Sequence, residues 1–234
     1  VDISRAEEDA GEVAGIKTLG IKILPQLDNV LANAGADVVV DFTTPTAVMK
    51  NIETSLKHKV RPVVGTTGIV EADLAQVKKW VEDANLGCII APNFAIGAVL
   101  MMLMAAKAAA YMDRAEIIEL HHNYKIDAPS GTAIKTAEMI SQAMVKTETA
   151  KPQHELEKVP GARGGKYKGI NIHSVRLPGL VAHQEVILGG LGQTLSIRHD
   201  SLSRTSFMPG VIMAIREVMK ENRLIYGLEN ILKL

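Results

Sequence analysis

The sequence has no excess of charge of either sign and almost no cysteine. Lysine and arginine together number 26, as do aspartate and glutamate, so the formal net charge is +0. No global field would therefore attract nucleic acid or an anionic membrane surface, and any preference for an anionic ligand must be local. The single cysteine, Cys88, excludes an internal disulfide and is typical of a protein in a reducing cytosol.

Long hydrophobic runs are missing as well. The longest apolar run covers residues 95–106 and ends at Lys107, which is shorter than the roughly 18 residues that a membrane span requires. We interpret this run as a buried helix. The first residues, VDISRAEEDAGE, are acidic and polar and do not resemble a signal peptide. The sequence therefore predicts a soluble, cytoplasmic protein with no membrane or nucleic-acid partner.

What is present is ordinary for a globular enzyme. The 234 residues are 47% hydrophobic and 22% charged, and they are enough for two modest domains or one large one. In the first half, β-branched runs at 38–42, 62–64 and 88–90 lack polar alternation, which is typical of strands buried on both faces. Helix signals follow the strands, with Thr44 as an N-cap and Pro45 at the first helical position. This alternation predicts a parallel α/β sheet.

The second half has a different pattern. We expect a strand at 116–122, a helix at about 131–145 and a mobile surface loop at 146–170, which is rich in Lys, Glu, Gly and Pro. Strand-like runs at 172–177, 183–188 and 193–199 are separated by short connections, which predicts antiparallel pairing. Residues 204–220 read as a final amphipathic helix. The predicted fold is an α/β nucleotide-type domain, residues 1–93 and 206–234, with an α+β domain, residues 94–205, inserted into it.

Polar turns follow the three strands of the first half. Ligands of open parallel sheets bind outside the carboxyl ends of the strands, so turns with exposed amides and hydroxyls there would suit a dinucleotide. The alternative is that these threonines and the asparagine only cap helices. The turns contain Thr43 and Thr44, then Gly65, Thr66 and Thr67, and then Ala91, Pro92, Asn93 and Phe94.

The segment most indicative of a functional site is residues 119–133, ELHHNYKIDAPSGTA. Two histidines and a lysine close a strand, and Ser130, Gly131 and Thr132 open a helix whose free amides could bind an anion. His121, His122 and Lys125 would add donors and positive charge, which suits a carboxylate-bearing substrate. An exposed turn with a capped helix is the alternative. Adjacent strand residues point to opposite faces, so at most one histidine should line a given pocket.

Other motifs carry less weight. A zinc site is disfavoured because the histidines lack helical i,i+4 spacing and Cys88 is distant in sequence, so no metal is expected. The glycines at 189, 190 and 192 lie between two strand-like runs and read as a hairpin turn. Arg176, Arg198 and Arg204 lie near strand ends, where we expect surface or interface charges.

These motifs together resemble the bacterial-type dihydrodipicolinate reductase family. The matching segments span essentially the whole chain, and the KxDAPSGTA motif at 125–133 is the most specific. The segments are DAGEVAG at 9–15, VDFT at 40–43, GTTG at 65–68, APNF at 91–94, residues 119–133, HSVR at 173–176 and RHDS at 198–201.

The resemblance implies a Rossmann-like nucleotide domain and the NADH- or NADPH-dependent reduction of 4-hydroxy-tetrahydrodipicolinate to tetrahydrodipicolinate in lysine and diaminopimelate biosynthesis. It implies that His121 and Lys125 are catalytic, and that the inserted domain binds substrate and builds a homotetramer through its sheet. The residues implied to bind substrate are His122, Ser130, Gly131 and Thr132, and those implied to contact the cofactor are Gly65, Thr66, Thr67, Ala91, Pro92, Asn93 and Phe94.

The sequence departs from the family pattern at its start. The family opens with a strand, a glycine-rich phosphate loop and a helix, and then a second strand that ends in an acidic residue. No such loop is present, and Val1-Asp2 aligns with the end of that second strand, so Asp2 resembles the acid that holds the adenosine ribose. We therefore expect this sequence to be an N-terminally incomplete form of the enzyme.

Two alternatives stay open from the residues. A different inserted-domain dehydrogenase, acting on a sugar or amino acid, would share the parallel α/β half but would not need Ser130-Gly131-Thr132 directly after the histidines and lysine. A non-catalytic dinucleotide-binding relative would be expected to have lost His121 or Lys125, and both are present.

Overall fold

The computed structural model describes residues 1–144 and 156–232. The chain forms two compact units, one of Val1–Pro92 with Val211–Leu234 and one of Asn93–Gly210. The sequence placed the corresponding boundaries after residues 93 and 205.

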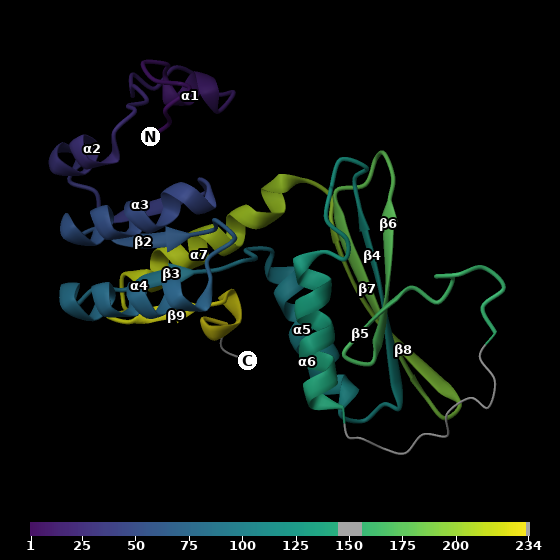
Figure 1. Cartoon of the computed structure of the whole chain (residues 1–234). Coiled ribbons are helices and arrows are strands. Elements are labelled where there is room, and N and C mark those ends of the chain that lie inside the picture. The colour runs from purple at the N-terminus through teal and green to yellow at the C-terminus, as the bar shows by residue number, and fades with distance from the viewer. Residues whose placement is uncertain (145–155, 233–234) are drawn as a thin grey trace. The chain divides into compact units, whose positions relative to one another are not determined.

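The first unit contains a parallel sheet of four strands in the order β1-β2-β3-β9. The first three match the strands expected from the sequence (Figure 1). Because every pair is parallel, the carboxyl ends of all four strands lie at one edge of the sheet. The bounds are β1 Val38–Asp41, β2 Arg61–Val64, β3 Cys88–Ile90 and β9 Leu224–Tyr226.

Helices α3 (Pro45–Lys57) and α4 (Glu71–Ala84) bury apolar residues at helical spacing in the core of this unit. Thr44 is the N-cap residue of α3 and Pro45 its first residue, as predicted, although the Thr44 side chain makes no capping bond. Strands β2 and β3 are almost fully buried, as their lack of polar alternation predicted. The same expectation is wrong for β1, which lies at the edge of the sheet and leaves Val40 39% exposed. The core cluster comprises Val48, Ile52, Leu56, Val64, Val77, Val81, Leu86, Cys88 and Ile90.

Short elements begin and end the chain. Helices α1 (Ala10–Val13) and α2 (Leu27–Ala34) precede the sheet. The single helix expected at 204–220 is instead a 3-10 turn, η1 (Arg204–Phe207), followed by α7 (Met208–Val218). Strand β9 and the 3-10 turn η2 (Leu228–Asn230) were not predicted. Three-residue elements carry no readable periodicity, so β9 is recognisable only from its pairing with β3.

The second unit is a five-stranded mixed sheet in the order β5-β6-β4-β7-β8, with α5 (Ile96–Ala109) and α6 (Gly131–Ala143) packed on it (Figure 1). Helix α5 is the apolar run that the sequence predicted to be a buried helix. None of the helices that the structure describes is long and apolar enough to cross a membrane. The strands are β4 Arg114–His121, β5 Gly165–Tyr167, β6 Ile170–Arg176, β7 Ala182–Gly190 and β8 Gln193–Ser201.

The prediction of consecutive antiparallel pairing is half wrong. Strands β7 and β8 form the expected hairpin, with Leu191 and Gly192 as its turn. Strand β6, however, pairs in parallel with β4, which lies between β6 and β7. Between β4 and β6 the chain passes through α6 and then β5, which pairs antiparallel with β6 and turns the chain back into the direction of β4. The loop expected at 146–170 falls partly on residues 145–155, outside the described residues, and its later part forms β5.

The two faces of the mixed sheet differ in burial at the central strand β4. Side chains on the face toward α5 and α6 are buried and mostly apolar, such as Ile117 and Val186, with Glu119 and Gln184 as buried polar exceptions. Successive strand residues alternate between faces. Glu116, Ile118 and Leu120 therefore lie on the other face, where they are only half buried.

Candidate active site

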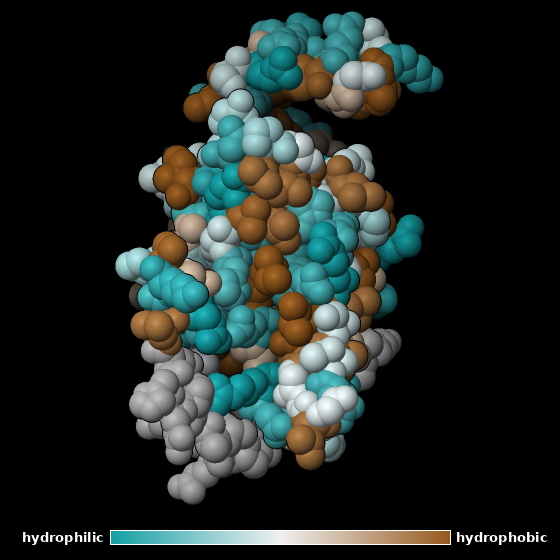
Figure 2. Space-filling model, turned by 90° about the vertical axis from the view of Figure 1, so that its right-hand side faces the viewer, coloured by the Kyte–Doolittle hydropathy of each residue, from teal (hydrophilic) through white to brown (hydrophobic). Residues whose placement is uncertain are grey.

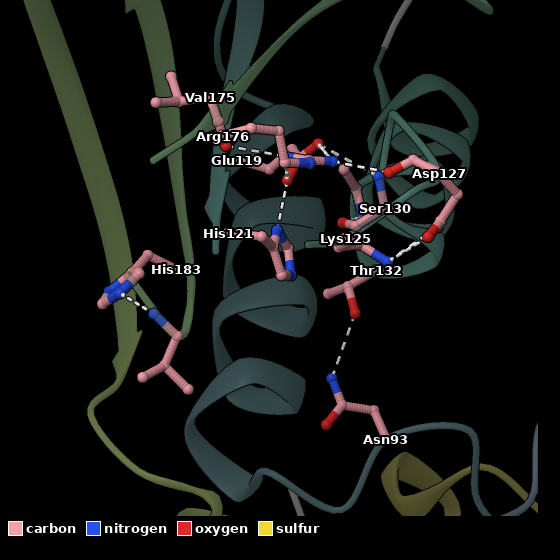
Figure 3. Close-up of polar contacts among 12 residues, drawn as sticks. Asn93, Glu119, His121, Lys125, Asp127, Ser130, Thr132, Val175, Arg176 and His183 are labelled. Atoms are coloured by element: carbon pink, nitrogen blue, oxygen red, sulfur yellow. Dashed lines mark hydrogen bonds and ion pairs between the residues drawn. The ribbon is translucent and has the colours of Figure 1, made fainter. Parts of the chain in front are cut away.

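The end of β4 and the start of α6 bring the predicted catalytic residues together (Figure 3). Glu119 and His121 lie two positions apart on β4, so both side chains lie on the face toward the helices. The turn after His121 carries Lys125 and then leads into α6, whose N-cap is Ser130.

Glu119 is the buried centre of this cluster. Its side chain is 0% exposed, and its oxygens accept bonds from Arg176 Nη2 at 2.7 Å, Arg176 Nη1 at 2.9 Å and the Ser130 amide at 3.3 Å. Burial alone would raise the pKa of this carboxyl. Hydrogen bonds from His121, Arg176 and Ser174 outweigh burial and lower the pKa of Glu119 to about 2. The carboxyl is therefore ionised at neutral pH.

His121 has its proton arrangement fixed by this carboxylate. Its Nδ1 lies 2.5 Å from Glu119 Oε2. An ionised carboxylate can only accept a hydrogen bond, so Nδ1 must donate, and the neutral ring carries its lone pair on Nε2. The side chain is 15% exposed, which leaves Nε2 as the atom that can exchange a proton with a ligand.

Lys125 lies beside an exposed acid. Its Nζ is 2.7 Å and 2.8 Å from the two carboxylate oxygens of Asp127, which is 65% exposed. The Lys125 ammonium holds the pKa of Asp127 below its ordinary value. Exposed ion pairs contribute little free energy, so a carboxylate ligand could replace Asp127 at low cost.

The start of α6 has backbone donors that the helix itself does not use. Ser130 caps the helix by accepting the Ala133 amide at 3.2 Å, and its carbonyl accepts the Ile134 amide. The geometry of a helix N-terminus leaves the amides of Gly131 and Thr132 without intrahelical partners. A Cβ built on Gly131 would meet nothing within 4 Å. A ligand can therefore approach this backbone closely.

His122 and Asn93 border the same cluster. Nδ1 of His122 is buried and has no hydrogen-bond partner among the described residues, and its ring lies near Tyr124, with centroids 6.3 Å apart. Asn93 donates to the hydroxyl of Thr132 at 3.3 Å and accepts the Ala95 amide (Figure 3). The predicted catalytic and substrate-binding residues thus belong to one continuous segment of the second unit.

The predicted cofactor turns lie at the carboxyl edge of the first unit's sheet. Asp41, at the end of β1, accepts hydrogen bonds from the backbone amide and hydroxyl of Thr43. It also accepts one from the Thr66 hydroxyl at 2.7 Å and one from the side-chain Nδ2 of Asn51 at 2.7 Å. The Thr66 hydroxyl is therefore occupied within the protein, and this turn presents its backbone and Thr67. Gly65 lies under the ring of Phe42, where a Cβ would be 2.1 Å from Phe42 Cε1.

The side chains of the remaining predicted cofactor residues differ in solvent exposure. Ala91 and Phe94 are 1% and 2% exposed, so they could offer only backbone, whereas Pro92 is exposed. Asp2 is exposed and accepts bonds from the amide and hydroxyl of Ser4. It does not belong to a strand of the sheet.

Sequence reasoning missed three residues that organise these sites. Glu119 stands out in the sequence only as part of a motif, and Asp41 only as part of a strand. The expectation that Arg176 is a surface or interface charge is wrong, because its side chain is 18% exposed and paired with the fully buried Glu119. Arg198, by contrast, is 47% exposed and paired with Glu185 and Asp200. The signal for Glu119 was its position, because a carboxylate on the inner face of a central strand must find partners.

Both halves of the chain match known family models. Residues 1–94 match the model described as "Dihydrodipicolinate reductase, N-terminus", and residues 97–232 match "Dihydrodipicolinate reductase, C-terminus". Proteins named 4-hydroxy-tetrahydrodipicolinate reductase are similar throughout. The one from Desulfitobacterium hafniense is 50% identical over 99% of this chain and 87% of that relative. The one from Listeria innocua is 50% identical over 99% of this chain and 88% of that relative.

Solved structures show the same likeness. The structure described as dipicolinate-bound dihydrodipicolinate reductase from Paenisporosarcina sp. TG-14 has a TM-score of 0.82 and 51% identity, covering 89% of this chain and 78% of that chain. An amine dehydrogenase from Mycobacterium smegmatis has a TM-score of 0.62 at 12% identity, covering 97% of this chain and 86% of that chain. That second likeness is one of fold alone.

Proposed function

Since this chain belongs to the dihydrodipicolinate reductase family, we propose that His121 and Lys125 are the proton-handling residues of its reaction and that the start of α6 binds its substrate. The reaction is the NAD(P)H-dependent reduction of 4-hydroxy-tetrahydrodipicolinate to tetrahydrodipicolinate, in lysine and diaminopimelate biosynthesis. A biosynthetic enzyme of this kind, with one buried free cysteine, belongs in the cytoplasm, and we propose that location.

The observation that carries the proposal is the convergence of His121, Lys125 and the free amides of α6 in one segment. A dicarboxylate needs donors, and the Gly131 and Thr132 amides with His122 and Lys125 supply both hydrogen bonds and positive charge. The dipicolinate bound to the related reductase from Paenisporosarcina is such a dicarboxylate. Ser130 contributes by capping the helix and so fixing the direction of its amides.

The cofactor is proposed to bind at the carboxyl edge of the first unit's sheet. The edge suits a dinucleotide, because it lies at the carboxyl ends of parallel strands and Asp41 holds the turns that carry Thr43 and Thr66 in place. We propose that Gly65, Thr66 and Thr67 contact it. Ala91, Pro92, Asn93 and Phe94 are proposed to do so mainly through backbone, and Asp2 through the ribose hydroxyls. When bound, the reduced nicotinamide supplies the hydride.

The protein's own residues then handle charge and protons. The 4-hydroxyl group leaves as water, and hydride addition to the resulting conjugated imine builds negative charge, which must be protonated. Lys125 holds a proton on Nζ, and His121 can accept or donate one at Nε2 because Nδ1 is bound to Glu119. The cationic donors also orient the substrate ring, which lowers the entropic cost of reaching the transition state.

Substitution of the two residues tests this assignment. General acid–base groups contribute about 100-fold to 10,000-fold in rate, so Lys125→Ala and His121→Gln should each lower kcat on that scale. Lys125→Ala should also raise KM, because it removes a charge that binds the carboxylate. Cofactor affinity, measured by fluorescence titration, should stay constant. His173→Gln, on the outer face of β6, is the matched control. Near-normal turnover by Lys125→Ala would mean that this segment is only a structural turn.

We also propose that the protein is a homotetramer built through the outer face of the mixed sheet. Figure 2 shows a column of apolar side chains running down this face between polar ones. The half-buried residues that alternation places there include Ile118, Leu120, Val175 and Ile187. Helices α5 and α6 contact the opposite face, so a second copy is the occupant that the family resemblance favours.

A further inference from the structure

Glu119 transfers no proton in the proposed chemistry, yet it accepts hydrogen bonds from three residues of the cluster. A buried carboxylate is costly unless its oxygens are hydrogen-bonded. Here they are bonded to the side chains of His121 and Arg176 and to the amide of Ser130 (Figure 3). These partners come from β4, from β6 and from the residue that starts α6.

Arg176 is itself fixed from two other directions. Its Nη1 donates to the Val175 carbonyl at 2.8 Å and its Nη2 to the Asp127 carbonyl at 2.8 Å. The guanidinium therefore ties the end of β6 to the turn that carries Lys125. Glu119 lies at the junction of these contacts, so its position sets that of the histidine ring relative to the helix start.

We propose that Glu119 is a positioning residue for the reduction, a role that rests on the proposed function of His121. Its carboxylate holds the Nδ1 proton of His121, so Nε2 is the atom left to exchange a proton with the substrate. Through the Ser130 amide, the same carboxylate holds that ring in register with the amides of Gly131 and Thr132. Glu119 does not itself touch the substrate.

The chain offers a matched control three residues away. Glu116 lies on the same strand but on the opposite face, and it also binds a histidine, an arginine and an amide. Its carboxylate is bonded to His173 Nε2 at 2.9 Å, Arg163 Nη2 at 3.0 Å and Asn171 Nδ2 at 3.3 Å. Glu116 bonds to a different histidine, so a substitution at Glu116 should leave the proton arrangement of His121 unchanged.

The test compares Glu119→Gln with Glu116→Gln in the full chain. Substituting the group that orients a metal-binding histidine commonly costs about 10-fold to 100-fold in activity or metal affinity, and we expect a fall of similar size in kcat for Glu119→Gln. Affinity for dipicolinate should stay close to that of the unmodified chain. Nitrogen-15 NMR of the imidazoles should show His121 protonated at Nδ1 in the unmodified chain and shifted toward Nε2 in Glu119→Gln. Glu116→Gln should change neither readout, provided that light scattering shows the same particle mass as for the unmodified chain.

Two further variants distinguish a loss of folding from a loss of histidine positioning. If Glu119→Gln fails to fold, as judged by circular dichroism and cofactor affinity, Glu119→Asp keeps the charge but withdraws it from Nδ1, and kcat should still fall. In a His121→Gln background, Glu119→Gln should cause no additional loss of kcat, because both changes remove one function. Additive losses, or an unchanged tautomer with normal kcat, would overturn the positioning role alone. Normal turnover by His121→Gln itself would instead overturn the proposed function.

Discussion

Glu119 links the acid stability of the protein to a single buried charge. Its pKa falls from an ordinary value of 4.5 to about 2 on folding, which corresponds to about 3 kcal/mol. A depressed folded-state pKa stabilises the fold above pH 4.5, and this stabilisation is lost as the pH falls toward 2. Glu119→Gln should therefore unfold at a lower urea concentration than the unmodified chain at pH 7. The difference between the two unfolding midpoints should narrow between pH 5 and pH 3. Glu116 is 39% exposed and therefore better screened by solvent. Glu116→Gln should lower the unfolding midpoint by less than Glu119→Gln does.

Gly131 gives a second prediction at the residue scale. A Cβ there meets nothing within 4 Å in the free protein, and alanine is the better helix former. Gly131→Ala should therefore unfold no more easily than the unmodified chain. If substrate approaches this backbone, the added methyl should weaken dipicolinate binding by about tenfold, roughly 1.4 kcal/mol. Gly165→Ala in β5, whose Cβ would also be unhindered, is the control. Unchanged dipicolinate affinity, measured by calorimetry, would place the substrate elsewhere.

The ends of β1 and β2 act together as one element of the cofactor edge. Asp41 holds the turns after both strands, and the Phe42 ring lies where a Cβ on Gly65 would stand. Gly65→Ala should push the 54% exposed Phe42 ring aside and lower NADH affinity by about tenfold without unfolding the sheet. The double variant Phe42→Ala/Gly65→Ala should bind NADH as Phe42→Ala does, because the clash is then absent. NADH fluorescence titration of the three variants measures this, and normal binding by Gly65→Ala would show that the turn does not contact the cofactor.

Association of the whole molecule can be tested on the outer face of the mixed sheet. A lysine placed within an apolar interface leaves an unpaired buried charge, which costs several kcal/mol. Ile187→Lys should therefore reduce the particle mass measured by light scattering, while circular dichroism stays unchanged. Tyr111→Lys changes an 89% exposed aromatic at the end of α5 and should leave the mass unaltered. A monomeric unmodified chain at micromolar concentration would contradict the tetramer.

The sequence by itself determined the elements whose signals are local. The positions of β1, β2 and β3, the Thr44-Pro45 start of α3, the Ser130 start of α6 and the turn at Leu191-Gly192 are all confirmed. Each depends on residues within one turn of helix or a few strand positions, so periodicity and capping chemistry suffice to predict it. The family was equally readable, because its motifs are short contiguous segments whose order survives in the sequence.

Only the tertiary structure decided which of those segments meet. Strand β6 could have paired with β7, its neighbour in sequence, but β4 lies between them, parallel to β6 and antiparallel to β7. That strand order brings Arg176 to Glu119 across 57 residues and converts an apparent surface charge into the partner of a buried carboxylate. Strand pairing is settled by the summed burial and hydrogen bonding of whole elements, and no local window of sequence contains that sum.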